Sequence, residues 1–155
     1  MTTSALSYAS STAITCTLNS LASGSARESN SVDNSSNLYI DALISVYATL
    51  AAGTPSSGIY VYVWGSEDGT SFPDGITGSD AGYTLKSPTN LSLARPIWTA
   101  TSGGLLWRAN PIGIAQFFGG IMPRKWGLVV LNSTSLAFAG SGNGVSYTGI
   151  KYTQA

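Results

Sequence analysis

Apolar and polar residues alternate most clearly between Leu38 and Leu50. Every second position is apolar, including Ile44 in the middle, and residues such as Asp41 and Ser45 lie between them. A period of two over this length is typical of a β-strand with one face on a core, because a helix would spread the apolar positions around its circumference. The segment predicts a long central strand whose other face meets solvent or a partner.

A second alternating segment, Ile59–Trp64, follows the turn-forming residues 53–58. Its β-branched residues fall on one side and its aromatic residues on the other. Two alternating segments joined by a Gly- and Pro-containing turn are typical of a β-hairpin. We therefore predict that residues 38–50 and 59–64 pair with each other.

The rest of the chain supplies a long loop and several shorter strand candidates. Residues 66–75 contain two Asp-Gly dipeptides, which favour tight turns, and the following residues to Asn90 are also rich in turn formers, so a long loop at one end of a sheet is predicted. The further strand candidates are Leu91–Ala100, Leu105–Arg108, Ile112–Phe118, Lys125–Asn132 and Val145–Thr153, with Ala13–Leu18 as a weak edge strand.

Composition supports the same fold class. The chain has 24 Ser, 16 Thr and 18 Gly among 155 residues, which disfavour helix, and 43% hydrophobic residues, more than a disordered chain normally carries. About eight strands with turns between them predict an all-β fold, an antiparallel, jelly-roll-like β-sandwich. We expect a single domain over residues 13–155, preceded by a flexible N-terminal arm over residues 1–12.

Charge and missing residue types narrow the function. Seven Lys and Arg balance seven Asp and Glu, and charged residues make up 9% of the chain, against a typical value of about 25%. Such a chain lacks the basic surface that binds nucleic acid or anionic lipid, and no apolar stretch approaches the length of a membrane span. We expect neither nucleic acid nor membrane as a partner, and no secretion signal.

Histidine is absent, and Cys16 is the single cysteine. This composition excludes Ser-His-Asp and Cys-His catalytic arrangements and a zinc site built from His and Cys. A free cysteine suits a reducing cytoplasm.

The acidic residues allow two alternative sites, a calcium site and a catalytic carboxylate pair. Glu67, Asp68, Asp74 and Asp80 lie close in sequence and could hold Ca²⁺, although their spacing matches no calcium motif and the Asp-Gly turns explain two of them. Asp41 and Glu67 could form a glycosidase pair, but nothing places them together. We expect no catalytic residues, no cofactor and no metal ligands.

The aromatic residues are the best candidates for a binding surface. The four tryptophans, Trp64, Trp98, Trp107 and Trp126, are most simply core residues. Tyrosine on a weakly charged, Ser- and Thr-rich face is typical of a protein contact and also suits sugar stacking, and the pattern leaves both open. The candidate interface residues are Tyr39, Leu43, Tyr47, Tyr60, Tyr62 and Trp64.

Three blocks carry a family resemblance: LASGSARESNSVDNSSNLYIDALISV (21–46), GIYVYVWGSEDGTSFPDG (58–75) and FFGGIMPRKWGLVVLNSTS (117–135), followed by VSYTGIKY near the end. In this order and spacing, over most of residues 13–153, they resemble small structural proteins of tailed bacteriophages that decorate or cement a capsid. The resemblance implies a jelly-roll-like β-sandwich that sits on the outer capsid surface as a small oligomer and has no catalytic role. It is also compatible with a place at the neck or on the tail.

The sequence thus predicts a virion structural protein, assembled in the host bacterial cytoplasm and located on the capsid surface. Its expected partners are the major capsid protein and further copies of itself, as a homodimer or homotrimer. The alternative is a carbohydrate- or receptor-binding module on the phage tail or capsid surface.

Overall fold

The alternating segments form strands of two antiparallel sheets in the computed structural model, which describes residues 3–98 and 104–154. Sheet A has the order β1 (Ser4–Tyr8), β12 (Gly144–Gln154), β5 (Asp41–Thr49), β10 (Ile112–Gly113), with β2 (Thr12–Ile14) also paired to β12 and β9 (Leu106–Arg108) to β5. Sheet B has the order β7 (Ala81–Tyr83), β3 (Ala26–Glu28), β11 (Lys125–Asn132), β6 (Gly58–Ser66), β8 (Ser92–Trp98), with β4 (Val32–Asp33) also paired to β11. Two short 3₁₀ helices, η1 (Pro73–Gly75) and η2 (Ala115–Phe118), complete the described elements.

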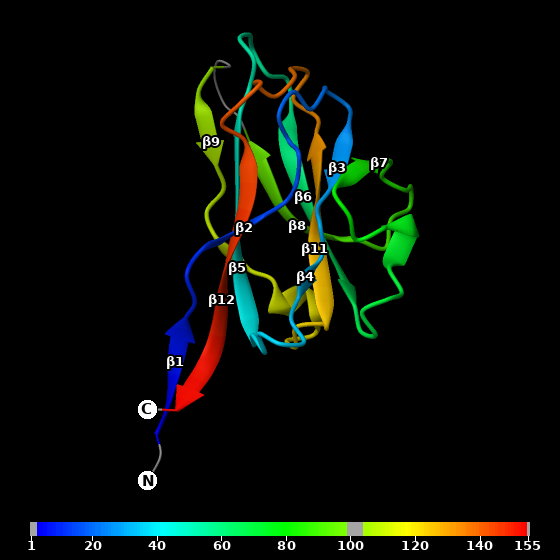
Figure 1. Cartoon of the computed structure of the whole chain (residues 1–155). Helices are drawn as coiled ribbons and strands as arrows, with labels where there is room; N and C mark the ends of the chain where they lie inside the picture. Colours follow the sequence, from blue (N-terminus) through cyan, green and yellow to red (C-terminus); the bar gives the residue numbers. More distant parts are fainter. Residues whose placement is uncertain (1–2, 99–103, 155) are drawn as a thin grey trace.

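The two sheets pack face to face (Figure 1), so the predicted all-β sandwich is confirmed. Its main core lies between the inner faces of the sheets, where the alternating apolar residues of the long strands meet. Ile44 and Val46 of β5 and Val61 and Val63 of β6 are at most 2% exposed, and Trp126 of β11 is completely buried. The jelly-roll connectivity stays a prediction.

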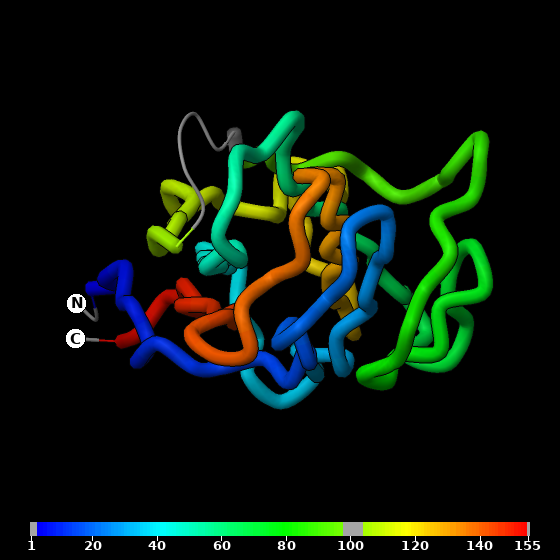
Figure 2. The backbone as a smooth tube through the Cα atoms, turned by 90° about the horizontal axis from the view of Figure 1, so that it is seen from above, coloured from blue at the N-terminus to red at the C-terminus, as the bar shows by residue number. Residues whose placement is uncertain are grey.

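A second, smaller core lies on the outer face of sheet B. Residues 67–91 leave the end of β6 and fold across this face, forming the side of the molecule opposite to β1 and β12 (Figure 2). The cluster beneath this segment consists of Ala26, Trp64, Ile76, Leu91 and Val129. Sheet B is therefore covered on both faces, whereas no comparable cluster covers the outer face of sheet A in the described residues.

The predicted strand over residues 38–50 is shorter than expected and begins at Asp41. Leu38 adopts a left-handed backbone conformation (φ 53°) and is 71% exposed, and Ile40 is 39% exposed. The cause is a turn closed by Asn34, whose side chain accepts a hydrogen bond from the Tyr39 N–H (2.9 Å) and donates one to the Tyr39 carbonyl (3.0 Å). Residues 38–40, the first of the alternating segment, lie in or directly after this turn, so β5 begins only at Asp41.

The predicted hairpin between residues 38–50 and 59–64 is wrong. β5 belongs to sheet A and pairs with β12, whereas β6 belongs to sheet B and pairs with β11 and β8. Both strands carry one wholly apolar face, so packing these faces together across the core buries them as well as edge-to-edge pairing would. The connecting residues 50–57 cross from one sheet to the other.

Among the shorter candidates, Lys125–Asn132 is confirmed with the predicted bounds, and 105–108 and 145–153 are confirmed with shifted ends. The candidate 91–100 is confirmed from Ser92 to Trp98, where this part of the described chain ends. The candidate 112–118 is a strand only at Ile112–Gly113, because Asp41 accepts the Ala115 N–H (2.8 Å) and the chain turns into η2. Of 13–18, only Ala13 and Ile14 belong to a strand. Residues 99 and 100 and the side chain of Trp98 lie outside the described residues.

Within the predicted arm, residues 4–8 form β1, which pairs with β12 from Ser4 opposite Gln154 to Tyr8 opposite Ile150. This pairing gives the segment a partner within the chain, and its flexibility stays a prediction. Residues 1 and 2 of the arm lie outside the described part.

Candidate functional site

The outer face of sheet A carries no second hydrophobic cluster within the described residues. Along β5, the buried residues Ile44 and Val46 alternate with Leu43, Ser45 and Tyr47, which are partly exposed. The strand register places small residues of β12 beside them: Thr148 opposite Leu43, Ser146 opposite Ser45 and Gly144 opposite Tyr47. Gly144 is required here because a side chain at this position would overlap the Tyr47 ring.

The same face continues onto β1 and the end of β12. Because side chains alternate along a strand, Tyr152 lies on the face of Thr148, and the register places Leu6 opposite Tyr152. Leu6 is 51% exposed, Tyr8 61% and Tyr152 64%. These three residues, together with Leu43 and Tyr47, give the face an apolar and aromatic character.

Charge is nearly absent from this surface. Within its strands, the outward positions include two charged side chains, Asp41 and Arg108. Asp41 is engaged internally, accepting hydrogen bonds from Ala42 N–H (2.7 Å) and Ala115 N–H (2.8 Å). The Arg108 guanidinium lies 4.7 Å above the Tyr47 ring centroid, so its charge is directed onto an aromatic ring. A face of this kind is suited to burial against another protein rather than to electrostatic capture of a ligand.

The six predicted interface residues do not form one surface. Leu43 and Tyr47 lie on the outer face of sheet A, whereas Tyr60 and Tyr62 lie on the outer face of sheet B. Tyr39 precedes β5 and packs on the inner side, edge-on to Tyr147 with ring centroids 6.2 Å apart. The prediction therefore identified two residues of the sheet A surface.

The prediction that Trp64 belongs to the interface is wrong, because this residue is 1% exposed and cannot contribute to a contact surface. Its ring lies under residues 67–91, edge-on to Phe72 at 5.4 Å between centroids. Gly127 on the neighbouring strand leaves room for the indole, since a side chain there would overlap it. Trp107 is partly buried against the main core and Trp126 lies within it, as predicted.

Sequence reasoning missed Leu6, Tyr8 and Tyr152. The signal was present as an alternation of Leu6, Ser7 and Tyr8, but it spans few residues in a Ser- and Thr-rich segment. Only the pairing of β1 with β12 brings these positions together.

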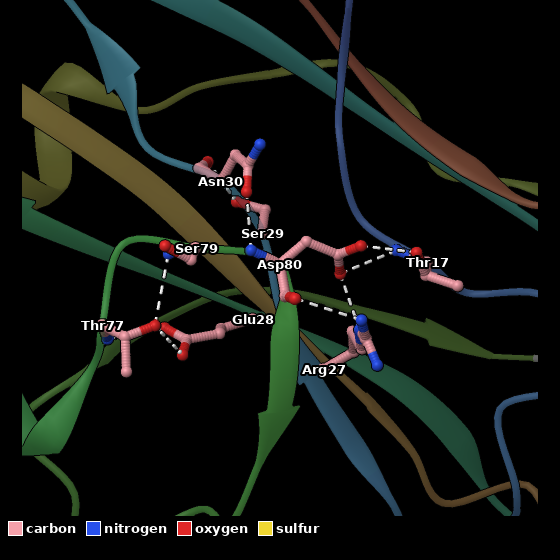
Figure 3. A network of polar contacts seen from close by, with 8 residues as sticks. All are labelled: Thr17, Arg27, Glu28, Ser29, Asn30, Thr77, Ser79 and Asp80. Carbon is pink, nitrogen blue, oxygen red and sulfur yellow. Dashed lines mark hydrogen bonds and ion pairs between the residues drawn. The ribbon is translucent and has the colours of Figure 1, made fainter.

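A network of polar side chains holds residues 77–80 against β3 (Figure 3). Glu28, which is 1% exposed, accepts hydrogen bonds from the Thr77 N–H (3.0 Å) and the Thr77 hydroxyl (2.7 Å). Asp80 forms an ion pair with Arg27 (2.6 Å, Nε to Oδ1), and accepts hydrogen bonds from the Thr17 N–H and hydroxyl. We call this set, together with Asn30, the Glu28–Asp80 clasp.

The clasp is structural chemistry rather than a catalytic arrangement. Both oxygens of Glu28 and both oxygens of Asp80 already accept hydrogen bonds from the chain. Burial alone would raise the pKa of Asp80, but the hydrogen bonds from Arg27 and Thr17 outweigh it and hold the pKa below its usual range. The carboxylate is therefore kept ionised as an anchor for the covering segment.

Asp68 and Asp74 of the same segment accept hydrogen bonds outside the Glu28–Asp80 clasp. Asp68 closes its own turn, accepting the Ser71 hydroxyl (2.7 Å) and the Thr70 N–H (2.7 Å), and these bonds lower its pKa. Asp74, with φ 54°, accepts the Asn90 N–H (2.7 Å), which lowers its pKa. The Asp-Gly turns are confirmed, since the glycines that follow both residues have positive φ. Within residues 3–98 and 104–154, no three His, Cys, Asp or Glu side chains gather as a metal ion would require.

The two acids of the glycosidase alternative lie at the ends of strands in different sheets of the sandwich. Asp41 begins β5 of sheet A, and Glu67 follows β6 of sheet B as an exposed loop residue. Cys16 is also unsuited to catalysis, because burial, assisted by Asp80, raises the pKa of its thiol to about 12. A protonated buried thiol is a poor nucleophile.

We expect Asp80→Asn to destabilise the protein by about 1.5–3 kcal/mol at pH 7, the range for hydrogen bonds to a charged group. The folded-state pKa lies below the unfolded value of 3.8, so the ionised form stabilises the fold above about pH 4, and the contribution disappears as the pH falls through the folded pKa. Urea unfolding at pH 7, 5 and 3 measures the difference, which should shrink at pH 3.

Glu67→Gln is the matched control, because it removes an acid from the same loop at an exposed position. It should change the free energy of unfolding by less than about 0.5 kcal/mol. An Asp80→Asn variant as stable as this control at pH 7 would contradict the anchoring role.

A shallow groove of about 570 Å³ lies at the edge of sheet B. Its walls combine the apolar side chains of Leu21, Leu85 and Leu131 with the Tyr83 ring and the Arg27 side chain. The volume suits a small molecule or a sugar. The Tyr83 hydroxyl donates a hydrogen bond to the Asp74 carbonyl oxygen (3.2 Å).

In the described part of the chain, no helix is both long and apolar enough to span a membrane. Comparison with known proteins gave no relative: no family model, no curated protein and no solved structure matches this chain.

Proposed function

We propose that the chain is a structural protein of a bacteriophage virion, without enzymatic activity, that decorates or cements the capsid by docking on the major capsid protein. The observation that carries the proposal is the uncovered outer face of sheet A, which is nearly free of charge and presents Leu43 and Tyr47 among small hydroxyl residues. The sequence resemblance to phage capsid decoration proteins points in the same direction. Burying this face across capsid subunits raises the free energy of opening the shell, because the bound state is stabilised by mass action.

The asymmetry of the sandwich supports this choice of surface. The outer face of sheet B is largely occupied by residues 67–91, and the Glu28–Asp80 clasp fixes them there. The outer face of sheet A has no such cover within the described residues. A weakly charged face with several exposed apolar and aromatic side chains is typical of a protein contact.

We expect Leu43→Asp and Tyr47→Asp each to weaken capsid binding at least about tenfold, since each places a charge in a desolvated contact. Raising salt from 0.1 to 1 M should weaken the wild-type protein little, because apolar burial and hydrogen bonding dominate. Co-sedimentation of the recombinant protein with purified capsids measures both effects.

Leu93→Asp is the control, because Leu93 is 46% exposed on the outer face of sheet B. It should bind capsids as the wild type does. Equal binding by Leu43→Asp, or release of the wild type by modest salt, would refute docking through sheet A.

The alternative is a carbohydrate- or receptor-binding module on the tail or capsid surface. The observation that favours it is the groove with Tyr83, Arg27 and hydroxyl groups, which suits a saccharide. Copy number separates the two functions: a decoration protein is present in hundreds of copies per virion, whereas a tail module is present in a handful.

A further inference from the structure

β1 and the end of β12 form a two-stranded ribbon that projects beyond the rest of the sandwich (Figure 1). The pairing of β12 with β5 ends where Ile150 lies opposite Asp41. From Lys151 to Gln154, the partner of β12 in the described residues is β1 alone. The ribbon therefore presents a strand edge away from the body of the domain.

The outer edge of β1 has a defined set of unpaired backbone groups. The Ala9 N–H donates to the Gly149 carbonyl (2.8 Å), so residue 9 and its partner form a hydrogen-bonded pair. Such pairs alternate along antiparallel strands with pairs whose backbone groups point away. By this alternation, Ser4, Leu6 and Tyr8 direct their N–H and C=O groups to the free edge, and Ser7 directs its own to β12.

This edge lacks the features that normally prevent pairing with another chain. No charged side chain precedes Arg27 in the sequence, and no proline precedes Pro55. The register of β1 with β12 runs from Ser4 to Tyr8 without a bulge. Natural proteins usually place charges, prolines or bulges on exposed edge strands, so an edge without them is suited to strand addition.

We propose that β1 pairs antiparallel with β1 of a second copy of this chain, around a two-fold axis at Leu6. In this register Leu6 faces Leu6 of the other copy and Ser4 faces Tyr8, and about six backbone hydrogen bonds form. The arrangement joins the sheets A of two copies into one continuous sheet. It also brings Leu6, Tyr8 and Tyr152 of both copies into one apolar strip on the outer face.

The occupant is a second copy because the edge is complementary to itself. A two-fold axis places the same uncharged residues opposite each other, so the pairing brings no like charges together. The projection of the ribbon also allows two edges to meet while the sandwich bodies remain apart (Figure 1). The inference rests on β1 and does not depend on capsid binding.

The contact is small. A strand edge of five residues, with Leu6 and Tyr8 touching the second copy only from the side, buries less than the roughly 1,200 Å² total of the smallest standard interfaces. We therefore expect a weak dimer that dissociates at micromolar concentrations. Binding side by side on a capsid would strengthen it by raising the effective concentration.

Charge exchange at Leu6 tests the pairing by sedimentation velocity from about 1 µM to 1 mM, a range that spans weak association. Leu6→Lys and Leu6→Glu each place like charges at the two-fold axis and should be at least about tenfold weaker dimers than the wild type. An equimolar mixture of the two should dimerise again, because opposite charges then face each other. Leu38→Lys, at a 71% exposed leucine outside the ribbon, should dimerise as the wild type does.

Hydrogen exchange on the unmodified protein provides a test that needs no variant. The amides of Leu6 and Tyr8 should exchange more slowly as the protein concentration rises, whereas exchange of the Ser7 amide, bonded to β12, should not change. A wild type that stays monomeric at 1 mM, dimers that tolerate Leu6→Lys, or a mixture that fails to associate would each overturn the proposal. Monomeric protein whose capsid binding is lost in Leu6→Lys would instead assign β1 to the capsid protein.

Discussion

Replacing Ile44 by Asp is expected to prevent folding to a soluble native state. Ile44 is 2% exposed at the centre of β5, and its register partners are Tyr147 on β12 and Ile112 on β10. An aspartate there would bury a carboxylate with no cation beside it, at a cost of at least about 4 kcal/mol. This cost is comparable with the whole stability of a domain of this size, about 5–15 kcal/mol.

Ser45→Asp is the matched control, since the next residue points to the outer face and its hydroxyl lies 3.5 Å from the Arg108 guanidinium. This variant should fold with a free energy of unfolding within about 0.5 kcal/mol of the wild type. Soluble expression and urea unfolding followed by circular dichroism compare the two. An Ile44→Asp protein that unfolds at the wild-type urea concentration would show that this residue does not face the core.

The long strands could be predicted from sequence because each gives several periods of alternation. β11 was predicted with its observed bounds, and residues 42–50 were predicted with the correct inward face. The pattern reports which side of a strand is buried, but it does not report which strand lies beside it. For this reason β5 and β6 were assigned to one hairpin, although their apolar faces meet across the core instead.

The short strands could not be predicted, and with them the described residues contain twelve strands instead of the predicted eight or so. β3, β4 and β7 have two or three residues each, which is too few for a period to be recognised. They lie in segments whose polar composition favours loops, and side-chain bonds such as those of Glu28 and Asp80 hold them in place. These bonds join residues about 50 positions apart in the chain, so no local sequence pattern predicts them.

The candidate surface was predicted in part for the same reason. Leu43 and Tyr47 stand out because the opposite face of their strand is wholly apolar. Tyr39 and Trp64 follow the same local pattern but are covered by other segments, Tyr39 by β12 and Trp64 by residues 67–91, which fold back over β6. Burial of an outward strand position depends on tertiary cover, which alternation alone does not contain.

Trp64→Ala is expected to cost about 3–5 kcal/mol, the range for removing a fully buried tryptophan. The indole is 1% exposed and supports Phe72, so its loss leaves a cavity beneath residues 67–91 and removes the apolar contact that complements the Glu28–Asp80 clasp. Because this cluster is separate from the main core, the covering segment should open before the sandwich unfolds. Limited proteolysis should therefore cut within residues 67–91 at urea concentrations where the rest of the chain is still protected.

Tyr62→Ala separates this effect from a general loss of aromatic area. Tyr62 lies two residues earlier on the same face of β6, but it is only partly buried at the margin of the cluster. Its removal should cost about 2 kcal/mol less than removal of Trp64, because less surface is taken from water. Equal losses of stability in the two variants, or cleavage of Trp64→Ala over the whole chain, would show that residues 67–91 unfold together with the main core. The difference between the two outer faces could then not be attributed to a separately stabilised cover on sheet B.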